Sequence, residues 1–167
     1  MSNKVKLFPS KKLKVELYND HKSVLADLKE YTDKSYSLVS DWTDKEFRGI
    51  VNESTFKVIS SEIGYGAMCV FEGKFDGDHG IIEIQLHKAF KGLLLAMPLS
   101  ICIPFIIGIL TNEMTAASLW NLLFIMPLFF IFVRLIFAEI GFRIVSRIGL
   151  KKLLTILQIT HLEEVQL

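Results

Sequence analysis

Cysteine and net charge are both scarce in this chain of 167 residues. Its two cysteines, Cys69 and Cys102, are too few for a disulfide scaffold and are predicted to be buried, reduced thiols. A content of 51% hydrophobic residues excludes an intrinsically disordered chain. Nineteen basic and 18 acidic residues give a net charge of +1, so no general electrostatic attraction to nucleic acid is expected.

Charge is almost absent from one long segment. Residues 93–138 contain only Glu113 and Arg134 as charged residues. About 20 apolar residues in a helix cross the roughly 30 Å hydrocarbon layer of a membrane. The sequence therefore predicts a transmembrane helical hairpin over 92–140, with spans at about 92–112 and 119–138, and argues against a fully soluble globule.

Residues 1–91 predict a β-rich domain with one N-terminal helix. Alternating apolar residues indicate a first strand over 12–18, and a helix is expected to begin at Ser23. Short alternating runs separated by turns predict an antiparallel sheet. Asp76-Gly77 between two such runs is typical of a hairpin. These four strands are expected over 46–51, 55–60, 67–75 and 80–87. Residues 33–44 are predicted to be a loop, with Trp42 as a plug for the core.

The C-terminal segment, 141–167, predicts an amphipathic helix. Leu150, Leu153, Leu154 and Leu157 follow the i, i+3, i+4, i+7 spacing of one helix face. This face is expected to pack on the sheet, or else the helix lies on the membrane surface. Four basic residues of this segment are the candidate lipid-facing residues: Arg143, Arg147, Lys151 and Lys152.

Basic residues lie at the two outer ends of the predicted hairpin, but not in the turn that connects its two spans. Lys88 and Lys91 precede it, the four basic residues above follow it, and its connecting turn has none. The positive-inside rule then predicts a multi-pass protein of the bacterial inner (plasma) membrane, with both termini cytoplasmic. Arg134 is the candidate functional intramembrane charge. Its alternative role is to extend its side chain to the membrane surface as part of a simple anchor.

Motifs for catalysis, metal ligation or cofactor binding are missing. The four histidines lack metal-site spacing, and there is no glycine-rich phosphate loop and no nucleophile elbow. No catalytic, cofactor-binding or metal-binding residue is therefore predicted, and no enzyme, cofactor, small-molecule substrate or nucleic-acid partner is expected.

The order FRGIV, FKVI, a Gly-Tyr break, VFEGKF and GIIEIQLHKAF resembles an uncharacterised group of small bacterial membrane proteins. In that group a β-rich domain is followed by a two-helix transmembrane hairpin and an amphipathic helix. The layout covers about 13–160 and the specific stretch is 46–91. The chain departs from the group at SSEIGYGAM, where the group has a more basic segment. The resemblance implies an architecture and a bacterial source, but no activity and no site residue.

Together these patterns predict an α+β membrane protein with a cytoplasmic antiparallel β-sheet domain, a transmembrane helical hairpin and a C-terminal amphipathic helix. The expected partners are the lipid bilayer and a protein partner or a homo-oligomer. The expected function is a membrane-anchored, non-enzymatic module that binds a protein partner or self-associates at the cytoplasmic face. The alternative is a membrane effector or protector in a defence or toxin-immunity system, acting through oligomerised transmembrane helices.

Overall fold

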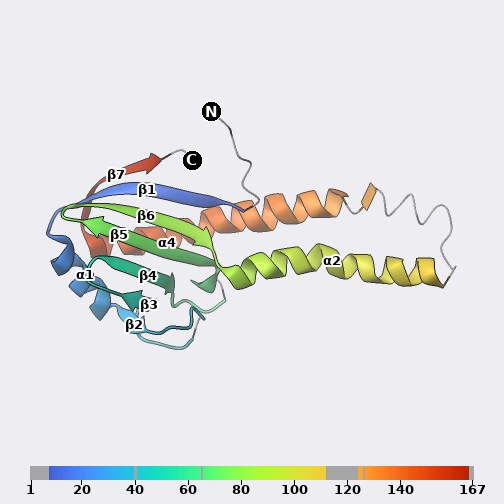
Figure 1. Cartoon of the computed structure of the whole chain (residues 1–167), viewed down its shortest axis with the longest axis horizontal. Helices are drawn as coiled ribbons and strands as arrows, with labels where there is room; N and C mark the ends of the chain where they lie inside the picture. The colour runs from blue at the N-terminus through green and yellow to red at the C-terminus, as the bar shows by residue number, and fades with distance from the viewer. Residues whose placement is uncertain (1–7, 40, 65, 112–123, 126, 166–167) are drawn as a thin grey trace. The chain divides into compact units, whose positions relative to one another are not determined.

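The computed structural model describes residues 8–39, 41–64, 66–111, 124–125 and 127–165, except for the side chains of 98, 101, 104, 105, 109, 134, 135 and 137 (Figure 1). The chain divides into two compact units. Met1–His87 and Phe142–Leu167 form one, here called the sheet unit, and Lys88–Gly141 forms the other, here called the helical unit. The C-terminal segment therefore belongs to the same unit as the N-terminal sheet.

Within its described residues the sheet unit has seven strands and two α-helices. The strands are β1 Ser10–Leu17, β2 Thr32–Lys34, β3 Phe47–Val51, β4 Thr55–Ser60, β5 Cys69–Asp76, β6 His79–Leu86 and β7 Ile159–Val165. The helices are α1 His21–Glu30 and α4 Gly141–Leu157, and a 3₁₀ turn, η1 Gly66–Met68, precedes β5.

The strands form a single sheet in the order β2-β3-β4-β5-β6-β1-β7. All neighbours are antiparallel except β2 and β3, which are parallel, so the predicted antiparallel sheet is corrected to a mixed one. β5 and β6 form the predicted hairpin, in which Asp76 pairs with His79 and Gly77 has φ +65°. Glycine is the residue that adopts this positive φ without steric cost.

One face of the sheet carries the core. The alternation expected for β6 is observed, because Ile82, Ile84 and Leu86 are buried. α1 adds Val24, Leu25 and Leu28 to the buried side chains. The strands contribute the largest of the others: Leu13, Val15, Leu17, Phe47, Phe56, Val58, Phe71 and Phe75.

α4 lies against this face of the sheet. Leu153 and Leu157 are fully buried, whereas Leu150 and Leu154 are only partly buried. The helix approaches the sheet closely at Gly149, where an added Cβ would lie 2.4 Å from Cζ of Phe71. The buried stripe of α4 thus keeps Leu153 and Leu157 of the predicted face and extends toward the N-terminus through Gly149, Ser146, Val145 and Phe142.

The helical unit contains α2, Lys88–Leu110, and the π-helix η2, Val133–Ile140, which contact each other. Over the residues that the structure describes, no helix combines the length and apolar composition needed to cross a membrane. The second predicted span, 119–138, lies partly outside the described residues. Its described C-terminal part turns into a π-helix at Val133 instead of continuing as one long α-helix.

The predictions that depended on a membrane crossing are corrected by this finding. They are the α+β membrane fold with a transmembrane helical hairpin, the description as an integral membrane protein, and the multi-pass inner-membrane location with cytoplasmic termini. The structure is an α+β fold with a seven-stranded mixed sheet. The alternative function, an effector acting through oligomerised transmembrane helices, depended on the same crossing and is not carried further.

Candidate functional site

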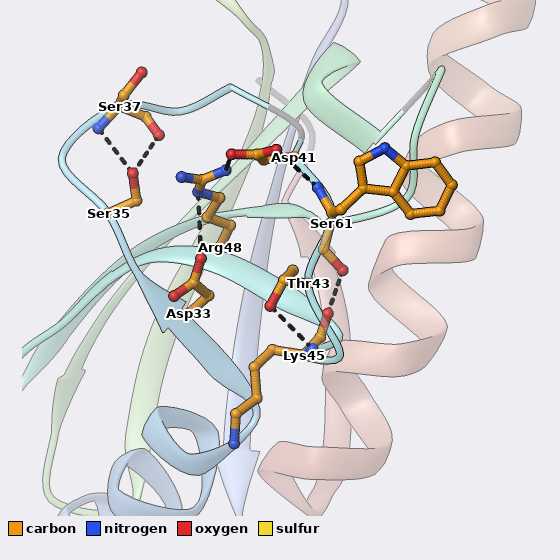
Figure 2. Close-up of polar contacts among 9 residues, drawn as sticks. Asp33, Ser35, Ser37, Asp41, Thr43, Lys45, Arg48 and Ser61 are labelled. Atoms are coloured by element: carbon orange, nitrogen blue, oxygen red, sulfur yellow. Dashed lines mark hydrogen bonds and ion pairs between the residues drawn. The ribbon is translucent and has the colours of Figure 1, made fainter.

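The loop between β2 and β3, residues 35–46, is held by several hydrogen bonds and by an ion pair (Figure 2). It is called the β2–β3 loop below, and residue 40 is outside its described part. Arg48 on β3 lies under it, because Phe47 and Gly49 take the core face of the strand and Arg48 takes the opposite face.

Arg48 connects this loop to the sheet through two carboxylates. Its Nη1 lies 3.0 Å from Oδ2 of Asp41, and its Nε lies 3.5 Å from Oδ2 of Asp33 (Figure 2). The Arg48 side chain is only 18% exposed, whereas the Asp41 side chain is 64% exposed, so a largely covered guanidinium meets a carboxylate that solvent still reaches. The planar guanidinium thereby fixes the middle of the loop to the end of β2.

The same contacts shift the titration of Asp41. The hydrogen bond from Arg48, followed by the hydrogen bond from the Trp42 backbone N–H, lowers the pKa of Asp41 from its ordinary value of 3.8. A carboxyl whose pKa is lowered by folding contributes stability above its unfolded pKa and loses it as the pH falls through the folded pKa. The contact is therefore expected to persist at pH 3.8 and to break only at more acidic pH.

Further hydrogen bonds hold both ends of the loop. At its start, the Ser35 N–H donates to the Gly49 carbonyl at 3.0 Å. At its end, Nζ of Lys45 donates to the Glu30 carbonyl at 2.6 Å, and the Ser61 hydroxyl donates to the Lys45 carbonyl (Figure 2). The loop is thus attached to α1, to β3 and to the segment after β4.

Large apolar side chains on this loop face solvent. Trp42 is 89% exposed, Tyr36 is 83% exposed and Val39 is 59% exposed. The prediction that Trp42 plugs the core is therefore wrong. Asp41 accepts the Trp42 N–H at 2.9 Å while Arg48 holds its other oxygen, so the backbone at Trp42 is fixed while its ring remains outside.

A second polar cluster joins α4 to the sheet. Nζ of Lys152 lies 2.6 Å from Oε2 of Glu46 and 2.7 Å from Oε1 of Glu62. Hydrogen bonds from these two glutamates raise the pKa of Lys152 above 10.5. Of the residues predicted to face lipid, Lys152 is therefore placed in an ion pair inside the sheet unit.

Replacing Lys152 with Met is expected to lower the free energy of unfolding by about 1–2 kcal/mol, since two charge-assisted hydrogen bonds are lost at a partly exposed site. Lys151→Met is the matched control, because Lys151 is exposed on the same helix. The raised Lys152 pKa implies that its contribution is fully present below pH 10.5 and is lost as the pH rises through the folded value. Urea denaturation at pH 7 measures the difference, and equal losses in the two variants would contradict it.

The other site residues predicted from the sequence lie neither at the Arg48 contacts nor at the Lys152 contacts. Arg143, Arg147 and Lys151 are exposed along α4. Arg134 lies in η2, and its side chain is outside the described residues. Sequence reasoning missed Arg48, Asp33 and Asp41 because charged residues in a loop-rich segment look like ordinary solvated positions. The one available signal was Arg48 itself, a charge inside the strand pattern FRGIV.

Among the described side chains, no group of three or more histidine, cysteine, aspartate or glutamate residues could hold a metal ion. Burial raises the pKa of the Cys69 thiol to about 12, so it is an unreactive thiol. An open cleft of about 600 Å³ between α1 and β3 is lined by Lys22, Lys29 and Lys34 and by one carboxylate, Glu53.

The helical unit carries the largest set of exposed apolar side chains. Seven of them on α2 are between 42% and 80% exposed: Leu93, Leu95, Leu99, Ile103, Ile106, Ile107 and Leu110. Exposed apolar side chains in this number are unusual on one helix, and large exposed apolar patches are found at interaction sites.

Comparison with known protein families, with curated proteins and with solved structures found no match to this chain. The resemblance to a group of small bacterial proteins therefore stays a prediction, and the site is interpreted from its own geometry.

Proposed function

We propose that this chain is a non-enzymatic protein-binding module in which the β2–β3 loop presents Trp42 to a protein partner. The observation that carries the proposal is the combination of a ring that is 89% exposed with a backbone held by Arg48 and Asp41. A tryptophan buries roughly 150–250 Å² when it is covered, at about 25 cal/mol per Å² of apolar surface. Leaving it outside forgoes several kcal/mol of stability, which a partner that covers the ring would recover.

The polar contacts of the loop support binding, because they reduce its cost. A loop that must become ordered on association loses conformational entropy for every residue that is immobilised. Here Arg48, Lys45 and Ser61 already hold the loop, so a partner would meet a preformed surface. Tryptophan, tyrosine and arginine are also the residues that dominate binding energy at protein interfaces.

The exposed apolar side chains of α2 support the same class of function. They require cover, and a protein surface of similar character would provide it.

The proposal is tested by placing a photo-crosslinking tryptophan analogue, which keeps the indole ring, at position 42 of the full chain and irradiating cells of the native host. We expect a discrete adduct of defined mass from position 42. The same substitution at Ile81, which is 40% exposed on β6, is the control and is expected to give no such adduct. No adduct at 42, or the same adducts from both positions, would contradict a specific partner.

A further inference from the structure

β7 forms an open edge of the sheet. It is the last strand in the order β2-β3-β4-β5-β6-β1-β7 and pairs with β1 alone among the described strands (Figure 1). With seven residues it is longer than β2, the three-residue strand at the other edge. A long, exposed edge strand presents unpaired backbone N–H and C=O groups on which another strand can pair.

The hydrogen bonds of β1 show which groups of β7 point outward. The Leu17 N–H donates to Asp78 on the β6 side at 2.8 Å, and the Tyr18 N–H donates to Gln158 on the β7 side at 3.2 Å. Backbone direction alternates along an antiparallel strand, so Lys14 and Glu16 of β1 direct their groups to β7. Their register partners Glu163 and His161 face β1 in return, which leaves the backbone groups of Leu162 and Glu164 directed outward.

The sequence of β7 is self-complementary about Leu162. In an antiparallel pair of two β7 strands centred there, Leu162 meets Leu162 of the second copy, and the outward-directed backbone groups of each donate to and accept from the other. His161 then lies opposite Glu163 of the second copy, and by symmetry this contact is made twice. Leu162 is 41% exposed, so its side chain is accessible to the matching leucine.

Neighbouring registers lack this complementarity. Centring the pair on Glu163 or on Glu164 places that glutamate against its own copy, and like charges directly opposite are unfavourable. Centring it on His161 separates His161 from Glu163 of the second copy. The pairing of opposite residues therefore selects the register about Leu162.

We infer that β7 pairs with β7 of a second copy of this chain, antiparallel and centred on Leu162, to join two sheets edge to edge. β2, and with it the β2–β3 loop, lies at the opposite edge of each sheet, so pairing through β7 leaves both loops accessible. The dimer would present two Trp42 side chains, and binding to a partner with two sites would then gain from bivalency. The inference rests on the backbone directions and charges of β7 and stands independently of the proposed function.

The register is tested by disulfide crosslinking of the full chain, kept in a nonionic detergent that covers the exposed apolar residues. Leu162→Cys is introduced together with Cys102→Ala, and Cys69 remains because it is buried. In a hydrogen-bonded antiparallel pair the two Cα atoms at 162 lie about 5.5 Å apart, within disulfide range. Glu164→Cys is the matched control, since in the same register its two copies lie roughly 14 Å apart.

After oxidation with copper phenanthroline, we expect at least tenfold more disulfide-linked dimer from Leu162→Cys than from Glu164→Cys. Arg48→Met, which releases the β2–β3 loop, should leave this ratio unchanged. Equal crosslinking at 162 and 164 would show random collision or association through another surface, such as the apolar helices or shared detergent or lipid. That result, or an absence of crosslinking at 162, would overturn the inference.

Discussion

Replacing Leu153 with Asp is expected to unfold the sheet unit. Leu153 is fully buried on α4, in the stripe that faces the sheet. Removing a buried leucine costs about 2–5 kcal/mol, and placing an unpaired carboxylate in the same position adds several more. The sum approaches the whole stability of a domain, roughly 5–15 kcal/mol.

Lys151→Asp provides the control, because it introduces the same residue at an exposed position two residues away. Circular dichroism during thermal unfolding should show a cooperative transition for Lys151→Asp and none for Leu153→Asp. A cooperative transition in both variants would mean that α4 does not cover the core of the sheet unit.

Replacing Gly49 with Ala is expected to lower the free energy of unfolding by about 3 kcal/mol or more. Gly49 has φ +152°, and an added Cβ would lie 2.2 Å from the Lys57 carbonyl oxygen and 2.8 Å from Cα of Val58. Both obstacles are backbone atoms of β4, so the clash can be relieved only by separating two paired strands. Backbone strain alone contributes about 1–3 kcal/mol, and the disrupted pairing adds to it.

Gly64→Ala is the control that separates backbone strain from the clash with β4. Gly64 also has a positive φ, +96°, but nothing lies within 4 Å of an added Cβ. Urea denaturation should show a clearly larger loss for Gly49→Ala, and equal losses would show that the approach of β4 to β3 is unimportant. Because Gly49 accepts the Ser35 N–H and follows Arg48, its substitution should also loosen the β2–β3 loop.

The parts of the fold that the sequence predicted are those with a strong local pattern. Alternation in β1 and β6, the hairpin at Gly77, and a C-terminal amphipathic helix can each be recognised within about ten residues. β2 could not be recognised, because its three residues, TDK, are stabilised by parallel pairing with β3 rather than by an apolar pattern. β7 could not be recognised either, because the change from helix to strand at Gln158, which has φ +49°, depends on pairing with β1.

The apolar run from Leu93 was the strongest signal in the sequence, and the membrane crossing that it predicted is corrected by the helices of the described residues. A count of apolar residues does not show how helices are divided along the chain, and the π-helix from Val133 has no local sequence signature.

The candidate site could not be predicted for a related reason. Arg48, Asp33 and Asp41 belong to one strand, a neighbouring short strand and a loop, and they meet only because β2 and β3 are parallel neighbours. Trp42 was expected to plug the core from the predicted loop. Its exposure depends on the direction of a loop held by contacts that are distant in sequence, such as Lys45 to the Glu30 carbonyl.

The most direct test of the central claim compares crosslinking from the photo-reactive tryptophan analogue at position 42 in the chain that keeps Arg48 and in Arg48→Met. The substitution removes the ion pair with Asp41 of the loop and the ion pair with Asp33 of β2, while leaving the apolar stem of the side chain in place. If the held loop forms the binding surface, Arg48→Met should reduce the discrete adduct at least tenfold, while the cooperative unfolding of the sheet unit is retained. An undiminished adduct from a released loop would contradict the account, because Trp42 would then bind without the preformed conformation that Arg48 provides.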